Sequence, residues 1–170
     1  MGTLTLLAIV AIIAVPVVTF YDFNGNSFDV TDRQVVLVAT DSMDGDVHDY
    51  AIDSFPANTL VMIEHLSEQE KLFLRVGDVV SYNDGGSLVH HRVVQTGNGY
   101  VYVHGDNNHS TEKVALEDIN GRVVGTNWVI GHILAAISAN FLLFLCCMFV
   151  VGSIAIVFAV YFGSPKGVAQ

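Results

Sequence analysis

The sequence has little cysteine and few basic residues, and its two ends carry almost no charge. Only two cysteines occur among 170 residues, and Cys146 and Cys147 are neighbours inside an apolar run. Adjacent cysteines in such a run are typical of packing residues, and nothing else in the chain offers a disulfide framework. The sequence also shows no cysteine–histidine spacing typical of a zinc site, so it predicts neither a metal nor another cofactor.

Charged side chains are confined to the middle of the chain. All 17 acidic residues lie between Asp22 and Asp118, six of the seven basic residues lie between Arg33 and Arg122, and only Lys166 follows. Six basic against 17 acidic residues give this middle segment a net charge of −11. The excess of negative charge argues against nucleic acid and anionic lipid headgroups as partners. It would suit a salt-rich exterior, where hydrated carboxylates keep a surface soluble.

Two long apolar runs flank the acidic segment. Residues 2–20 and about 138–162 are each long enough to cross the roughly 30 Å hydrocarbon core of a bilayer as a helix. No Lys or Arg precedes the first run, which favours an uncleaved membrane anchor over a cleaved signal peptide. Neither run has an amphipathic stripe, which favours membrane spans over a buried hairpin of soluble helices.

These runs predict three parts. An amino-terminal transmembrane anchor covers residues 2–20, a domain outside the membrane covers 21–133, and a second transmembrane helix covers 138–162. Lys166 follows the second span and therefore places the carboxyl end in the cytoplasm. Two spans would put both termini on that side of the cell membrane and the middle domain on the other.

The middle segment has the patterns of short strands separated by turns. Apolar runs at 35–39, 60–63, 100–104 and 122–130 predict strands, and Asn-Asp-Gly-Gly between the runs 78–82 and 88–95 predicts a hairpin. Ser67 and Glu70 form a capping-box pattern, which predicts one short helix at 67–73. The fold class expected is a mainly β, antiparallel, barrel-like domain between two transmembrane helices.

Three clusters contain residue types that acyl transfer requires. Ser42 follows an apolar strand, where its hydroxyl could attack a carbonyl and its N–H could hold the oxyanion, although most such serines cap turns. His90 and His91 are neighbours on a strand, so only one can face a site and accept a proton there. Asp106 or Glu112 could orient that imidazole, although the Gly-Asp-Asn-Asn segment also has good turn chemistry.

The order of these clusters resembles type I signal peptidases, in particular the archaeal and endoplasmic-reticulum branch, which uses serine and histidine. The matching boxes are Thr-Asp-Ser-Met at 40–43, Gly-Asp-Val-Val at 77–80, Val-His-His-Arg-Val at 89–93, Gly-Asp-Asn-Asn at 105–108 and Gly-Arg-Val-Val-Gly at 121–125. The resemblance runs from the first apolar run to about residue 133. Bacterial relatives use a lysine base in the strand that here contains the histidines, and this strand has no lysine.

The resemblance implies a membrane serine endopeptidase that cleaves signal peptides from secretory precursors. Ser42 would be the nucleophile, and His91, which directly precedes Arg-Val, would be the general base. The hydroxyl of Thr40 would help the N–H of Ser42 to form the oxyanion hole. Asp106 and Glu112 are equal candidates for the carboxylate. The partners implied are preproteins that carry signal peptides, the lipid membrane and subunits of the secretory machinery.

Two departures from the family pattern support an alternative. Relatives usually have a proline soon after the Ser-Met pair, where this chain has Asp44-Gly45, and relatives of this branch have Asp at the position of Glu112. A non-catalytic, membrane-anchored relative that binds or scaffolds secretory machinery is therefore the second interpretation. A metal-dependent hydrolase is a weaker third, and its ligands would be the histidines at 90, 91, 104 and 109.

Overall fold

The computed structural model describes residues 27–30, 32–108 and 110–162. The chain divides into two compact units, one covering residues 25–135 and a second whose described part is 136–162. The predicted anchor at 2–20 and the imidazole of His109 lie outside the described residues. The second predicted span, 138–162, lies within them, and a helix covers its part from Phe141 to Phe162.

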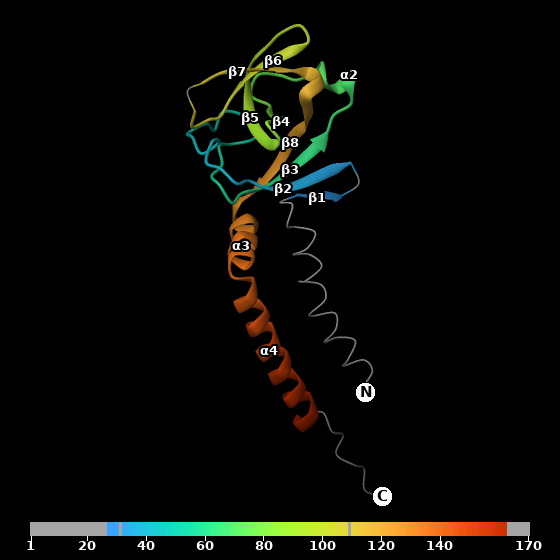
Figure 1. Ribbon diagram of the computed structural model, residues 1–170, viewed down its shortest axis with the longest axis vertical. Helices are drawn as coiled ribbons and strands as arrows, with labels where there is room; N and C mark the ends of the chain where they lie inside the picture. The colour runs from blue at the N-terminus through green and yellow to red at the C-terminus, as the bar shows by residue number, and fades with distance from the viewer. Residues whose placement is uncertain (1–26, 31, 109, 163–170) are drawn as a thin grey trace, which may run out of the picture. The chain divides into compact units, whose positions relative to one another are not determined.

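The first unit is built on one antiparallel sheet of eight strands in the order β1-β2-β3-β8-β4-β5-β6-β7 (Figure 1). All the strands and the short helix predicted from the sequence are present, whereas β1 and β7 had no recognised sequence signal. The elements of this unit are β1 Ser27–Val30, β2 Arg33–Leu37, β3 Leu60–His65, α2 Glu68–Lys71, β4 Val79–Asp84, β5 Ser87–Thr96, β6 Tyr100–His104, β7 Glu112–Ala115, the 3-10 helix η1 Leu116–Asp118 and β8 Ile119–Asn127.

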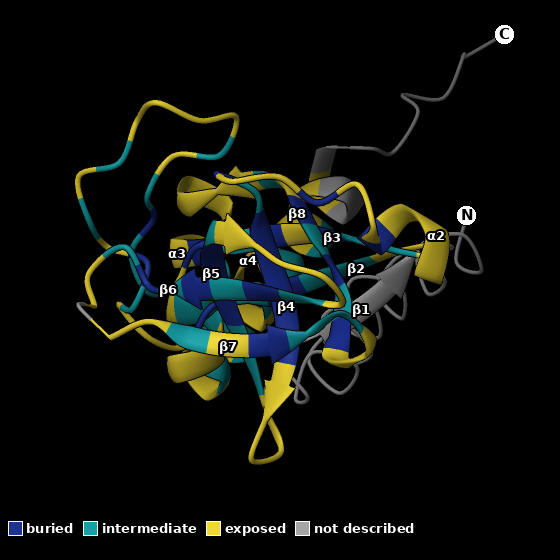
Figure 2. Cartoon of the chain, turned by 90° about the horizontal axis from the view of Figure 1, so that it is seen from above, coloured by how far each residue is buried: buried dark blue, intermediate teal, exposed yellow. Residues whose placement is uncertain are grey.

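All neighbouring strands pair antiparallel, which confirms that part of the prediction. The sheet is open, so the predicted barrel-like closure is wrong. Strands β1 and β7 are its edges, and no pairing joins them among the described residues. A closed barrel has one interior, but this sheet has two apolar clusters, and the neighbours Val79 and Val80 belong to different ones. Successive residues of a strand point to opposite faces, so β4 buries both of its faces. Buried residues accordingly follow β4 and β5 through the middle of the sheet (Figure 2).

The hairpin between β4 and β5 fixes the register of the two histidines. Its two-residue loop is Gly85-Gly86, with φ of +56° and +89°, and this left-handed conformation is the one that a tight hairpin turn requires. The resulting register pairs Ser81 with His90 and Val80 with His91. His91 therefore shares a face with Val80, and His90 lies on the opposite face.

Local capping explains where the helices begin. Ser67 and Glu70 form the predicted capping box at the start of α2. The run predicted as a strand to residue 130 becomes a helix at Trp128, because the side chain of Asn127 accepts the N–H of Ile130 at 2.9 Å. Helix α3 covers Trp128–Ala139, and helix α4 covers Phe141–Phe162. By length and composition, α4 can cross a membrane.

Candidate active site

Ser42 lies on a turn that several backbone bonds hold in place after β2. Its carbonyl oxygen accepts the N–H of Asn107 at 3.0 Å. The next side chain, Met43, is fully buried in the apolar cluster against β2 and β3. The carboxylate of Asp41 accepts the N–H of Ala57 at 2.7 Å. The half-buried Ser42 is therefore fixed on both sides along the chain.

Gly105 brings the turn of Ser42 next to the ring of His91. A Cβ atom on Gly105 would lie 2.4 Å from the carbonyl oxygen of Ser42 and 3.2 Å from Nε2 of His91. The first distance is shorter than real Cβ contacts, so a side chain at this position would displace one of the two. The Gly-Asp-Asn-Asn segment contains a turn, as its composition suggests, and its glycine leaves room for the backbone of Ser42 and the ring of His91.

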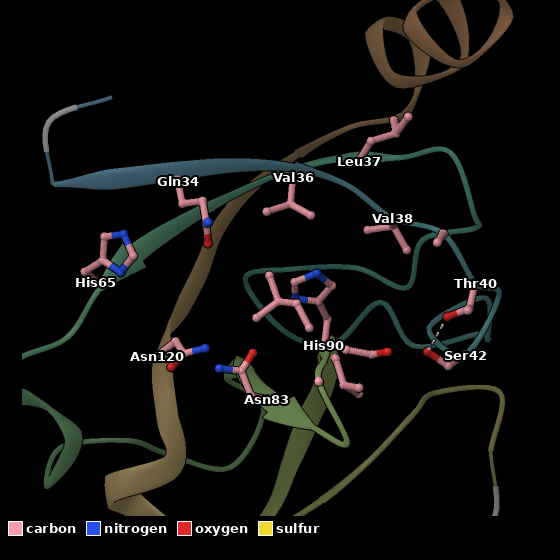
Figure 3. Close-up of a pocket in the computed structure, with 15 residues that line it drawn as sticks. Gln34, Val36, Leu37, Val38, Thr40, Ser42, His65, Asn83, His90 and Asn120 are labelled. Carbon is pink, nitrogen blue, oxygen red and sulfur yellow. Dashed lines mark hydrogen bonds between the residues drawn. The ribbon is translucent and has the colours of Figure 1, made fainter. Parts of the chain in front are cut away.

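Thr40 is adjacent to the hydroxyl of Ser42. The two hydroxyl oxygens lie 3.4 Å apart, and either one can donate (Figure 3). Thr40 is exposed, so its hydroxyl is free to turn toward a group that approaches Ser42. A hydroxyl beside the candidate nucleophile could donate to an oxyanion that forms there.

The imidazole of His91 is buried and held at one nitrogen. Only 6% of the residue is exposed, and Nδ1 lies 2.8 Å from the hydroxyl oxygen of Tyr82. The same hydroxyl donates to Oε2 of Glu112 at 2.7 Å. Nδ1 of His91 and Oε2 of Glu112 are 3.9 Å apart, so the contact between them runs through Tyr82. No sequence motif pointed to Tyr82, although the hairpin register places it two residues from Val80, the partner of His91.

Burial lowers the pKa of His91, and the carboxylate of Glu112 opposes that shift. Neighbouring groups act more weakly, with His104 lowering this pKa and Asp106 and Asp84 raising it. Because desolvation dominates, the ring is neutral near pH 7 and can accept a proton. Burial also raises the pKa of Tyr82, and the hydrogen bond to Glu112 adds to that effect, so the phenol keeps its proton.

Asp106 forms a buried ion pair with Arg92. Its two carboxylate oxygens accept Nε and Nη2 of Arg92 at 2.8 and 2.6 Å, and the hydroxyl of Ser54 donates to it at 2.7 Å. The side chain of Asp106 is fully buried and that of Arg92 nearly so. Two-point pairing with a guanidinium occupies both oxygens of Asp106. Of the two predicted carboxylates, only Glu112 is linked to the imidazole by hydrogen bonds.

His90 has its own partner on the opposite face of β5. Its Nδ1 lies 2.7 Å from the hydroxyl of Ser81. Burial, with a smaller contribution from the charge of His91, lowers the pKa of His90 to about 4. His90 also lines a groove, together with Ser42, in which His91 takes no part.

That groove has a volume of about 730 Å³ and runs beside β2 as far as Ser42. Figure 3 shows apolar side chains and the hydroxyls of Thr40 and Ser42 at one end, and polar side chains at the other. Strand β2 and the chain after it form one wall, and the hairpin of β4 and β5 forms the other. The labelled lining residues are Gln34, Val36, Leu37, Val38, Thr40, Ser42, His65, Asn83, His90 and Asn120.

The backbone carbonyl of Ser42 and Nε2 of His91 both lie beside Gly105, but no hydrogen bond joins the side chains of Ser42 and His91 within the part of the chain that the structure describes. A serine–base bond that is long before the substrate binds is common, since it shortens in the complex. In the same described part, no three His, Cys, Asp or Glu side chains converge as metal ligands would. Comparison of the sequence with protein-family models and with curated proteins gives no match.

Proposed function

We propose that this chain is a membrane-bound serine endopeptidase of the signal peptidase I type, which cleaves signal peptides from secretory precursors. The observation that carries the proposal is the contact at Gly105, where the backbone of Ser42 and Nε2 of His91 approach the same point. A nucleophile and a neutral, buried base on a fixed turn are what acyl transfer needs. The resemblance of the sequence boxes to this family supplies the substrate class.

In the proposed reaction, His91 accepts the proton of Ser42 while the hydroxyl oxygen attacks the scissile carbonyl. The hydroxyl of Thr40 and the N–H of Ser42 stabilise the oxyanion. The protonated His91 then gives its proton to the leaving amine, which breaks the peptide bond and leaves an acyl-enzyme. His91 finally activates a water molecule that hydrolyses this ester and releases the signal peptide.

Glu112 is the carboxylate that we assign to the base. Its link to His91 through Tyr82 supports this assignment, and the pairing of Asp106 with Arg92 argues against the alternative. Asp106 instead has a structural role, because it fixes the loop whose residues Gly105 and Asn107 contact the turn of Ser42.

The groove is the proposed site for the extended substrate. It ends at Ser42 and follows the backbone of residues 37–40, so that main-chain hydrogen bonds could align the scissile bond. Val36 and Val38 line the groove and are buried, and we expect this apolar part of the groove to admit small side chains. The substrate would have small residues at the first and third positions before the cut, as signal-peptide cleavage sites do.

Helix α4 supports the membrane part of the proposal. Its most apolar window, Phe141–Phe158, has no buried residues. A bilayer would cover these side chains, and it would hold enzyme and precursor in one plane, which lowers the entropy cost of their encounter. The proposed arrangement keeps the sheet domain outside the cytoplasm of the cell and both termini inside it. Subunits of the secretory machinery are possible partners in that setting.

The missing hydrogen bond between Ser42 and His91 in the described residues favours one competing function. A non-catalytic relative that binds or scaffolds secretory machinery would keep the fold and the turns without an aligned serine and histidine. Such a protein would retain its membrane setting and would cleave nothing.

The test is cleavage of a model preprotein by the purified full chain in detergent or vesicles. We expect cleavage by the wild type and a loss of about 10⁴-fold or more in Ser42→Ala, with His91→Ala equally impaired, because members of one catalytic unit fail together. His90→Ala tests which histidine is the base: His90 lines the substrate groove, so its loss can slow cleavage, but the loss should be far smaller than that of His91→Ala. Folded wild-type protein that cleaves no preprotein would favour the scaffold function, and an essential His90 would overturn the assignment of the base.

A further inference from the structure

A tyrosine hydroxyl separates the proposed base from its carboxylate. The hydroxyl of Tyr82 donates to Oε2 of Glu112 at 2.7 Å and lies 2.8 Å from Nδ1 of His91. The direct separation of 3.9 Å between Nδ1 and Oε2 is too long for a hydrogen bond. The hydrogen-bonded link from Glu112 to the imidazole therefore runs through Tyr82, in addition to the electrostatic effect of the carboxylate on the pKa of His91.

The number of protons in this chain of bonds determines the tautomer of His91. An ionised carboxylate can only accept hydrogen bonds, and a phenol has a single proton to donate. Since Tyr82 gives that proton to Glu112, its oxygen can only accept from His91. Nδ1 must then be the protonated nitrogen, and Nε2, the atom next to Gly105 and the turn of Ser42, keeps its lone pair.

Burial and exposure both support this direction of donation. Only 4% of Tyr82 is exposed, and its hydroxyl lies between Nδ1 of His91 and Oε2 of Glu112. Glu112 has 43% of its side chain exposed and lines an open hollow of about 420 Å³, where water can solvate its charge. In the chain of hydrogen bonds from His91 through Tyr82 to Glu112, the carboxylate is solvated and the ring is buried. Glu112 is therefore the acceptor from Tyr82, and His91 is the donor to Tyr82.

We propose that Tyr82 is a positioning residue of this site, which holds His91 in the tautomer that leaves Nε2 free to accept the proton of Ser42. Glu112 contributes by accepting the hydroxyl proton of Tyr82, which keeps that proton from donating to the ring of His91. This inference rests on the proposed peptidase function for its kinetic consequence, but the tautomer itself can be measured without any substrate.

The proposal predicts an unusual order among variants. In Glu112→Ala, the hydroxyl of Tyr82 loses its acceptor and can donate to Nδ1, which moves the ring proton to Nε2 and disables the base. In Tyr82→Phe, nothing selects either tautomer, so part of the protein keeps the active form. The double variant resembles Tyr82→Phe. Removing the tyrosine should therefore partly rescue the loss of Glu112.

The first measurement is the ¹⁵N spectrum of the full chain with labelled histidine, in detergent. The ring signals of His91 are identified as those missing in His91→Gln. We expect a protonated Nδ1 in the wild type, a protonated Nε2 in Glu112→Ala, and a mixture in Tyr82→Phe. Tyr102→Phe, on β6, is the matched control and should give the wild-type spectrum. An unchanged His91 signal in both Tyr82→Phe and Glu112→Ala would overturn the proposal.

The second measurement is the rate of preprotein cleavage by the same proteins. We expect a loss of about 10-fold in Tyr82→Phe, about 100-fold in Glu112→Ala, and about 10-fold in the double variant, within the range that a general base contributes. Losses that multiply in the double variant would refute the coupling. If the variants change the tautomer of His91 as expected but the wild type cleaves no preprotein, the result would support the role of Tyr82 in orienting His91 and would refute the peptidase function.

Discussion

Neighbouring residues of β5 differ sharply in what surrounds them. His90 is bonded to Ser81 on one face of the sheet, and His91 is bonded to Tyr82 on the other. The next residue, Arg92, is buried and pairs with Asp106. Three consecutive polar side chains in a buried strand each have a partner, which is the condition under which burial of polar groups is tolerated.

The lowered pKa of His90 implies that the stability of the folded protein depends on pH. Its folded pKa of about 4 lies below the value of about 6.5 for an unfolded chain. The unfolded state therefore binds a proton first as pH falls, so the stabilisation is full above pH 6.5 and is lost between pH 6.5 and 4. The loss is on the order of 3 kcal/mol from this group.

We expect His90→Asn to flatten that part of the profile, because asparagine does not titrate and can still bond to Ser81. The measurement is the melting temperature of wild type and variant by circular dichroism, from pH 8 to pH 4.5. His48→Asn, at an exposed position, is the matched control and should follow the wild type. Parallel curves for wild type and His90→Asn would contradict the prediction.

At the scale of elements, the site depends on one loop packed against another. The chain after β6 contacts the turn after β2 through Gly105, through the N–H of Asn107 and through Gly45. A Cβ atom on Gly45 would lie 2.6 Å from the carbonyl oxygen of Asp106. This contact gives a physical reason for Gly45 in the segment where the family that the sequence resembles usually has proline.

Gly105→Ala tests this packing. The added methyl group would push the turn of Ser42 from His91, and a displacement near 1 Å can cost about 100-fold in rate. We expect that loss in a protein that still folds, with stability reduced by about 1–3 kcal/mol. Gly125→Ala is the matched control, because its Cβ would meet nothing within 4 Å. Equal cleavage rates for the two variants would show that the contact has no catalytic consequence.

At the scale of the whole molecule, charge and apolar surface are segregated along the sequence. The middle segment carries a net charge of −11 from six basic and 17 acidic residues. Helix α4 exposes large apolar side chains, among them Leu142, Phe149 and Tyr161. A polar, acidic domain and an uncovered apolar helix in one chain are consistent with the proposed position at a membrane.

The acidic charge predicts that salt stabilises the protein. Like charges on the surface repel each other, and salt shortens the range of that repulsion to about 3 Å at 1 M. Between 0.01 and 1 M NaCl we expect the melting temperature to rise by about 5 °C, which corresponds to about 1 kcal/mol for a domain of this size. Sucrose of equal osmolality is the control and should give a smaller rise. A melting temperature independent of salt would show that self-repulsion is unimportant.

The sequence by itself determined the features that depend on neighbouring residues. Gly85-Gly86 specified the hairpin and its register, Ser67 and Glu70 specified the start of α2, and strand β6 was predicted at its observed bounds. These features follow from local backbone preferences and hydrogen bonds that span only a few residues. Local signals also gave Ser42 and the pair His90 and His91 as candidates, and the resemblance of the sequence boxes selected His91 from that pair.

Only the tertiary structure decided which distant residues become partners. Asp106 and Glu112 were indistinguishable in the sequence, but one pairs with Arg92 and the other bonds to Tyr82, 30 positions away. The tertiary structure also decided that the sheet is open, because strand order and burial on both faces arise from contacts between distant segments. Each such pairing depends on which alternative leaves the fewest buried polar groups unsatisfied, and that balance is set by the whole packed chain.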